Sequence, residues 1–423
     1  MDILSKLLQD IPLPKMVKIR QRFDDFALPD SSAACREAVR KPEVIGRVAK
    51  GQQVAVAVGS RGVANLPALV RETVAAIKDA GAFPFIVPSM GSHGGATAEG
   101  QAEVLAHLGV DEASVGAPVR STMEVVEIGR LDNGLPIYVD RYAYEADAIV
   151  VINRVKPHTA FRGQIESGIM KMLAIGLGKQ KGAEACHQLG FKYMAENVPN
   201  MARVMLEKLP VAFGLAVVEN AYDQTCLVEA LVPETLEERE RELLREAKAR
   251  LPKLLFTQLD VLVIDYIGKN ISGDGMDPNV TGRYPTPYAS GGPDVSKMVV
   301  LDLTPETKGN ANGVGTADFT TQRLVDKTDL ATMYANGLTS TVCAPTKIAT
   351  TLHNDRLAIQ AAVKTCNILD YTQCRVARIR DTLHLGEIEI STTLLEEAAA
   401  HPDIEIIGEP YEWTFDEEGY LPK

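Results

Sequence analysis

A repeated order of apolar run, polar loop and helix-forming segment constrains the fold of this chain more than any other feature. Four apolar runs stand out in the first half: VAVAV (54–58), FPFIV (83–87), AIVVIN (148–153) and FGLAVV (213–218). Runs of this length predict buried strands. Helical patterns over Leu66–Ala80 and Ala98–Leu108 follow the first two runs. Because strands alternate with helices, we expect an α/β domain with a mostly parallel sheet.

A second set of similar elements follows in the remainder of the chain. VLVIDYIG (261–268) and MVVLDL (298–303) predict strands, and helical patterns cover Phe319–Ala335 and Asp355–Cys366. The expected fold class is therefore α/β, with two α/β domains whose sheets are mostly parallel or mixed and an active site in the interdomain cleft. The expected limits are 1–257, 258–395 and a tail, 396–423, that returns to the first domain. The charged helix 233–251 is expected to connect the domains through a solvated face.

Charge and cysteine usage narrow the partners and the compartment. With 44 basic and 56 acidic residues, the net charge is −12, which repels phosphate backbones and argues against nucleic acid. A small acid would need a local basic site. No apolar run approaches the roughly 20 residues that span a bilayer, and the start, MDILSKLLQD, has no secretory pattern. Six scattered cysteines without a CxxC are typical of reduced thiols. We expect a cytoplasmic protein without a membrane partner, compatible with a homo-oligomer.

Reactive side chains follow the predicted strands of the first domain. In parallel α/β sheets, ligands bind at the carboxyl ends of the strands, on the loops that lead into helices. Arg61 follows the first run in GSRG, His93 follows the second in GSHGG, and His158 follows the third in RVKPHTAFRG. Lys171 stands in SGIMK, and His187 comes 16 residues later. We therefore expect a functional site built from these loops.

Each of these residue types suits a particular task. A guanidinium at position 61 can grip a carboxylate or phosphate through two parallel hydrogen bonds, or it pairs with a surface acid. The glycines around His93 permit the close approach of a ligand. Lys171 lies among apolar residues, where an amine becomes a nucleophile, unless its head reaches water. His187 taken alone is more often structural, and Cys186 beside it is more often a small buried residue than a metal ligand.

Several reaction classes lose support because their motifs are missing. The sequence has no GxSxG, no HExxH, no Walker A and no full GxGxxG after a strand. Two uses of the histidines remain open. Three of them from separate segments would suit zinc, whereas two on opposite sides of a carbon would suit a racemase, which needs an acid or base on each face.

In the order and spacing of these residues, the chain resembles the nickel-dependent lactate racemase family of 2-hydroxy acid racemases and epimerases. The resemblance rests on SRG after the first strand, GSHGG after the next, PHTAFRG around His158 and SGIMK ending at Lys171. It continues with His187 and is strongest over 157–187.

The resemblance implies a cofactor and roles for these residues. Its members use nickel in a nickel-pincer nucleotide, a pyridinium-3-thioamide-5-thiocarboxylic acid mononucleotide tethered to a lysine. Lys171 would be the tether and His187 the nickel ligand. His93 and His158 would be the paired acid/bases while the substrate's hydride moves to the cofactor and back. Arg61 would bind the substrate carboxylate or the cofactor, and cofactor-assembly proteins would be partners.

The second domain and the departures from the family concern the substrate. Lys269 resembles a family lysine that closes over the substrate. The family's SGGPK is SGIMK here, three extra residues separate His158 from Lys171, and the segment 268–283 differs. These differences favour a larger or more polar hydroxy acid than lactate, contacted by Asp274, Asp277, Asn279 and Arg283, unless the segment is a plain loop. A zinc-dependent hydrolase or lyase that uses His93, His158 and His187, or a catalytically silent nucleotide- or organic-acid-binding protein, is the alternative.

Overall fold

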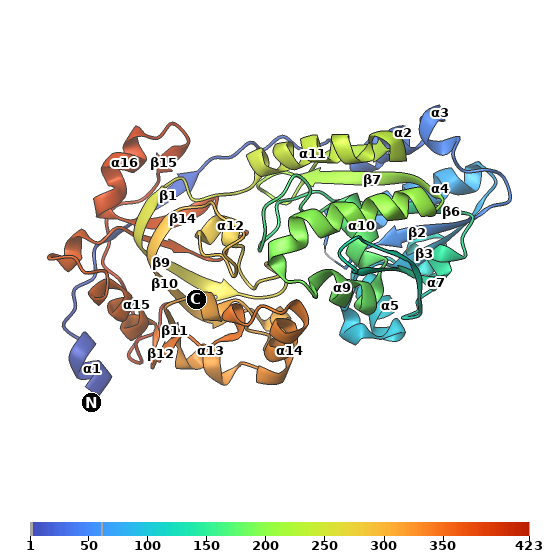
Figure 1. Ribbon diagram of the computed structural model, residues 1–423. Helices are drawn as coiled ribbons and strands as arrows, with labels where there is room; N and C mark the ends of the chain where they lie inside the picture. Colours follow the sequence, from blue (N-terminus) through green and yellow to red (C-terminus); the bar gives the residue numbers. More distant parts are fainter. Residues whose placement is uncertain (1–2, 61, 423) are drawn as a thin grey trace. The chain divides into compact units, whose positions relative to one another are not determined.

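The computed structural model describes residues 3–60 and 62–422. The chain forms two compact units (Figure 1). The first unit is Asp25–Leu251, and the second joins the segment that ends at Asp24 to the segment that begins at Pro252. This division differs from the expected one, because the N-terminal segment and the tail 396–423 both belong to the second unit. The reason is strand pairing, since β1 (Met16–Gln21) lies between β14 (Glu387–Ser391) and β15 (Ile404–Ile406).

The first unit contains a five-stranded sheet in the order β3-β2-β6-β7-β8. All neighbours are parallel except the last pair. The strands are β2 (Gln53–Val58), β3 (Phe83–Pro88), β6 (Ala148–Arg154), β7 (Val211–Glu219) and β8 (Thr225–Leu231). A two-stranded hairpin is also present, formed by β4 (Val125–Arg130) and β5 (Pro136–Asp140). The four apolar runs are thus confirmed as strands of one sheet.

Helices cover this sheet and close its core. Two predicted helices are confirmed almost to the residue, as α4 (Leu66–Asp79) and α5 (Ala98–His107). Alternate residues of β2, beginning at Val54, pack in one cluster with apolar residues of α4, and α11 packs along β7 (Figure 1). The helices of this unit are α2 (Ser31–Val39), α3 (Pro42–Ile45), α4, α5, α6 (Glu112–Val115), α7 (Arg141–Tyr144), α8 (Ile169–Lys171), α9 (Lys179–His187), α10 (Met194–Lys208) and α11 (Pro233–Arg250).

The second unit has an eight-stranded mixed sheet in the order β12-β11-β10-β9-β13-β14-β1-β15. The pairs from β12 to β13 are parallel, and those from β13 to β15 are antiparallel. Both faces of β9 are covered, because Val261 and Val263 enter one core cluster while Leu262 and Ile264 enter the other. The remaining strands are β9 (Gln258–Ile267), β10 (Asp294–Leu303), β11 (Phe319–Thr321), β12 (Thr350–Leu352) and β13 (Val376–Ile379).

One predicted helix of the second unit is wrong. Phe319–Ala335 begins as strand β11, which pairs with β10, because the β-branched residues Thr320 and Thr321 suit a strand. Thr321 then caps the helix that follows by accepting from the N–H of Leu324. The helices are α1 (Ile3–Leu8), α12 (Pro278–Thr281), α13 (Gln322–Asp326), α14 (Leu330–Ser340), α15 (Asp355–Lys364) and α16 (Leu395–Ala400). Within 3–60 and 62–422, no helix combines the length and the apolar character needed to cross a membrane.

Candidate active site

Three neighbouring strands deliver the predicted loops to one edge of the first sheet. β2 lies between β3 and β6 and is parallel to both, so their carboxyl ends are adjacent. The loops after β2 and β3 meet, because the hydroxyl of Ser60 and Nδ1 of His93 share a short hydrogen bond. The ring of His93 is exposed. Arg61 lies outside the described residues.

His158 is held by the loop after β6. Its backbone N–H donates to Oε2 of Glu166 at 2.8 Å, and its Nδ1 accepts from the N–H of Ala160 at 3.0 Å. The ring packs on Phe161, with centroids 4.4 Å apart. Because Nδ1 is engaged as an acceptor, the neutral ring carries its proton on Nε2. In this tautomer Nε2–H is a hydrogen-bond donor that His158 can offer to a ligand.

The charges around His158 show which groups surround it. Burial, followed by the positive charges of Lys171 and His187, holds the pKa of His158 well below its ordinary value of 6.5. Coulombic coupling of this kind acts over short distances. The structure thus brings together the three side chains that the sequence placed in one segment, and it keeps the imidazole of His158 neutral near pH 7.

Lys171 ends a short helix that is fixed by groups from elsewhere in the chain. α8 continues into a π-helical segment, Met172–Gly176. α8 begins after Gly168, whose φ of +91° and ψ of −155° are accessible essentially to glycine alone. The Gly168 carbonyl accepts from Asn153 Nδ2 at 2.8 Å. Lys171 itself is half-buried, at the end of a helix whose start is fixed by these contacts.

Glu240 of α11 completes this helix start, and the sequence did not point to it. Its carboxylate accepts from the backbone N–H of Ile169 at 2.6 Å and of Met170 at 3.3 Å. Burial raises the pKa of Glu240 to about 8, although these two donors oppose the rise. The helix 233–251 was expected to be only a solvated connector. A signal was available, because Glu240 interrupts an otherwise apolar stripe of Leu236, Leu243, Leu244 and Ala247.

Glu166 is a second buried acid that organises the same region. It accepts from the backbone N–H of Gly163 at 3.2 Å as well as from that of His158. Lys248 of α11 donates at 2.6 Å to Oε1, the oxygen that also accepts from Gly163. α11 therefore holds both the loop that carries His158 and the helix that carries Lys171.

His187 has the hydrogen bond expected of an imidazole that binds a metal. Its Nδ1 lies 2.6 Å from the carbonyl oxygen of Ala183, one turn earlier in α9, so Nδ1 carries the proton and Nε2 presents its lone pair. Burial lowers the pKa of His187, which keeps the ring neutral. Phe191 lies between the two imidazoles, with centroids 5.4 Å from His187 and 6.1 Å from His158.

The alternative ligands do not gather around His187. The thiol of Cys186 is buried against the Met194 sulfur, and burial raises its pKa to about 12, so the interpretation of Cys186 as a small buried residue holds. Among the described residues, no group of three His, Cys, Asp or Glu side chains is placed to hold a metal ion. The three-histidine arrangement of the zinc hypothesis is therefore not formed in this structure, whereas a single imidazole ligand is present.

In the second unit, Lys269 follows β9, at the carboxyl end of a parallel strand. Its Nζ donates to the carbonyl of Gly273 at 2.6 Å. Side chains of the 268–283 segment hold its backbone and attach it to neighbouring parts of the second unit. Asp277 caps α12 by accepting from the N–H of Asn279 at 2.9 Å. Arg283 donates to the carbonyls of Val295 and Ser296 and pairs with Asp318 at 2.9 Å. This arrangement favours the plain-loop interpretation of the segment over a substrate pocket.

Comparison with known proteins agrees with this geometry. Residues 29–197 match the family model of the lactate racemase N-terminal domain, a range that contains every predicted site residue of the first unit. No curated protein matches the chain by sequence. Among solved structures, the chain is similar to the lactate racemase apoprotein from Thermoanaerobacterium thermosaccharolyticum, with 14% identity, a TM-score of 0.52, and 91% of this chain and 96% of that chain covered. Residues 29–197 are therefore similar to the N-terminal domain of lactate racemases, and the chain shares the fold of a lactate racemase apoprotein.

Proposed function

We propose that the protein is an isomerase that racemises or epimerises a 2-hydroxy acid. The observation that carries the proposal is that His158 and His187 both pack on Phe191, with the charge of Lys171 acting on His158, inside the region that matches the lactate racemase N-terminal domain. The proposed cofactor is a nickel-pincer nucleotide. Cofactor-assembly proteins would be its partners, and the cytoplasm its compartment.

The residues present fit that cofactor. Lys171 offers a half-buried amine at the end of a fixed helix, suited to a covalent tether. His187 offers one imidazole nitrogen whose orientation is set by the Ala183 carbonyl, and nickel accepts such a ligand beside sulfur donors. When bound, the cofactor supplies a reversible hydride acceptor. Everything else is the work of the chain's own side chains.

His158 and His93 would move the proton of the substrate hydroxyl. A base takes this proton as the α-hydrogen leaves, which gives a planar keto acid, and return of the hydride to the other face inverts the centre. In this structure His158 presents an Nε2–H donor, so it would take the hydroxyl proton at Nε2 only after its own proton moves to Nδ1 and the bond from Ala160 is released. His93, from the neighbouring loop, would act from the opposite side through the ring that Ser60 orients. Arg61 and Lys269 are the proposed carboxylate ligands.

The test is to produce the chain together with cofactor-assembly proteins and offer it single enantiomers of 2-hydroxy acids of increasing size and polarity. We expect the opposite enantiomer of at least one acid to appear on chiral chromatography, in protein that holds about one nickel per chain. Bound zinc with hydrolytic activity would instead support the hydrolase alternative. A loaded cofactor without inversion of any acid would support a silent binding protein.

A further inference from the structure

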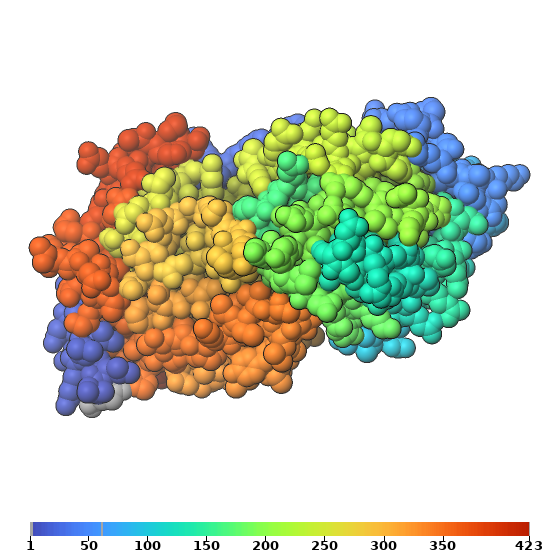
Figure 2. All heavy atoms as spheres, in the orientation of Figure 1, coloured from blue at the N-terminus to red at the C-terminus, as the bar shows by residue number. Residues whose placement is uncertain are grey.

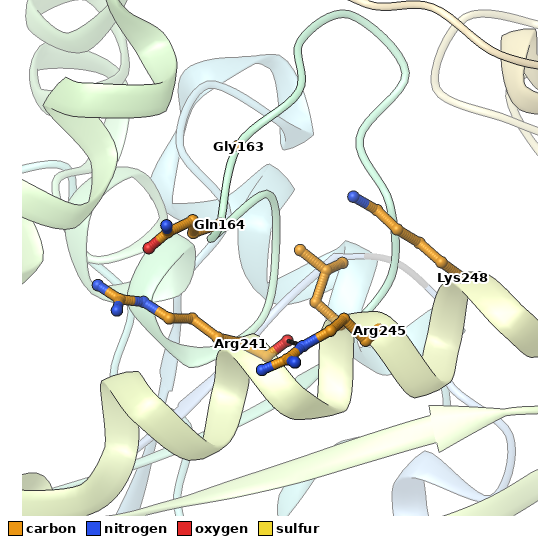
Figure 3. A pocket seen from close by; sticks show the side chains of 6 residues that line it. Gly163, Gln164, Arg241, Arg245 and Lys248 are labelled. Atoms are coloured by element: carbon orange, nitrogen blue, oxygen red, sulfur yellow. Dashed lines mark hydrogen bonds between the residues drawn. The ribbon is translucent and has the colours of Figure 1, made fainter.

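A cavity of about 450 Å³ lies on the first unit, away from the residues assigned to the proposed reaction. Its walls are the turn Gly163-Gln164 and one face of α11, and α11 lies at the surface (Figures 2 and 3). Arg241, Arg245 and Lys248 line it, together with Leu244. Half of the lining residues are thus cationic and none is acidic, in a chain whose net charge is −12.

The three cations follow one another along a single helix face. Arg245 is one turn from Arg241, and Lys248 is three residues further, spacings at which like charges on a helix repel each other. The helix dipole favours a cation in the last turn of α11, where only Lys248 of the three lies. The dipole does not explain why all three cations line one cavity, where a bound anion would relieve the repulsion between them.

The existing partners of these cations leave bonding capacity for a ligand. Arg241 pairs with Glu237 through one nitrogen, but its Nε is buried without an acceptor. Arg245 is exposed, and its only contact in the described structure is a long bond from Nε to the Arg241 carbonyl, at 3.5 Å. Lys248 donates to Glu166 at 2.6 Å. Two arginines with unused donors in a fork geometry suit oxyanions.

We propose that this cavity binds a small anion with two or more negative charges, a phosphate or a polycarboxylate. Its volume lies within the range of small-molecule sites. It also provides the local positive charge that a small acid requires in order to bind a chain with a negative net charge. The site is also connected to the loop that carries His158, since Lys248 contacts Glu166, which accepts from the His158 N–H. A ligand in the cavity would therefore act on contacts that lie next to the proposed catalytic histidine.

The proposal is tested by calorimetric titration of the purified chain, without cofactor, with inorganic phosphate and separately with citrate at low ionic strength. We expect saturable binding of at least one of them to one site, weakened about tenfold or more by Arg245→Gln, because a charge-assisted bond is lost. Arg241→Gln should weaken it as well. The phosphate and citrate arms distinguish the two anion classes.

The matched control is Arg71→Gln, which removes an exposed arginine from α4 of the same unit. It lowers the net charge equally without touching the cavity, so anion affinity should stay within about twofold of the wild type. Equal affinity in the Arg245→Gln and wild-type proteins, or no saturable binding below about 10 mM of either anion, would overturn the proposal. Thermal melting of each variant checks that it is folded.

Discussion

Two polar loops, each after a buried parallel strand, use similar residues in opposite ways. The loop after β6, 155–168, contains His158, Arg162 and Glu166, and the loop after β9, 268–283, contains Lys269, Asp277 and Arg283. In the first loop, the buried acid Glu166 binds backbone N–H groups, and the His158 imidazole keeps Nε2 for a ligand. In the second loop, Asp277 and Arg283 bind the loop's own backbone and its neighbours.

This difference shows what distinguishes a ligand-binding loop from a structural loop at equivalent positions in a sheet. A loop at the carboxyl end of a parallel strand can be either of the two. The loop after β6 and the helix that follows it are supported from outside, by Lys248 and Glu240 of α11, and His158 adds one bond to the loop backbone through Nδ1. The loop after β9 uses Asp277 and Arg283 for that purpose.

The largest effect should follow loss of the proton-transfer group in the first loop. His158→Gln in the loaded enzyme is expected to lower kcat/KM for the substrate by about 10²–10⁴, because a positioned acid or base contributes that much. Enantiomer inversion measured at saturating and limiting substrate gives the value. The control, His107→Gln, removes an exposed histidine from α5 of the same unit and should leave the rate within about twofold. A normal rate in the His158 variant would place proton transfer elsewhere.

Gly168→Ala should disrupt the start of the lysine helix. A Cβ at this position would lie 2.6–2.8 Å from the Glu240 carboxylate, on a backbone with a φ of +91°. Strain and overpacking together should cost about 3–5 kcal/mol of the free energy of unfolding. Urea denaturation followed by circular dichroism measures this cost. Gly62→Ala, where an added Cβ meets nothing within 4 Å, should change stability by less than about 1 kcal/mol, and similar losses in the two variants would refute the assigned contact.

Glu240→Ala tests the external support directly. It leaves the N–H groups of Ile169 and Met170 without their acceptor and opens a buried cavity, so the loss should be about 2–4 kcal/mol. Glu238→Ala removes an exposed acid from the same helix and should cost less than about 0.5 kcal/mol. Both variants are compared by urea denaturation. If they lose equal stability, α11 is only the solvated connector that the sequence suggested.

Arg283→Ala tests the structural role of the second loop. It removes the bonds to Val295 and Ser296 and the pair with Asp318, which should cost about 1–3 kcal/mol of stability. Cofactor loading and the fold of the first unit should be unchanged, because the contacts lie in the second unit. A variant with unchanged stability and a higher KM for the substrate would indicate instead that the 268–283 segment forms part of the substrate pocket.

The smallest effect is the pH dependence of stability without cofactor. Folding lowers the pKa of both His158 and His187 below 6.5, so the unfolded chain binds protons that the folded chain does not. The contribution of the two histidines should be fully present above pH 6.5 and fall on acidification by about 1 kcal/mol per pH unit per histidine, while the raised pKa of Glu240 acts in the opposite direction. The slope between pH 6.5 and 5 should be smaller in His158→Gln than in the wild type. Equal slopes would show that His158 is not held neutral.

Local sequence features predicted much of the fold and the site. The apolar runs identified the strands, and the glycine-rich turns that follow them marked the loops of His93 and His158, because both signals involve residues close in sequence. Glu240 was missed because its contact with Ile169 joins residues 71 positions apart, and an acid on a charged helix resembles a solvated one. The place of β1 between β14 and β15 was missed for the same reason.

The central claim is that Lys171 is the residue to which the proposed nucleotide cofactor is covalently attached. It is tested by digesting protein produced with the cofactor-assembly proteins and measuring the peptide masses beside those of Lys171→Ala. The account predicts the nucleotide adduct on the peptide that contains Lys171 and its complete absence from the variant. An adduct on another residue, or one that persists in Lys171→Ala, would contradict it.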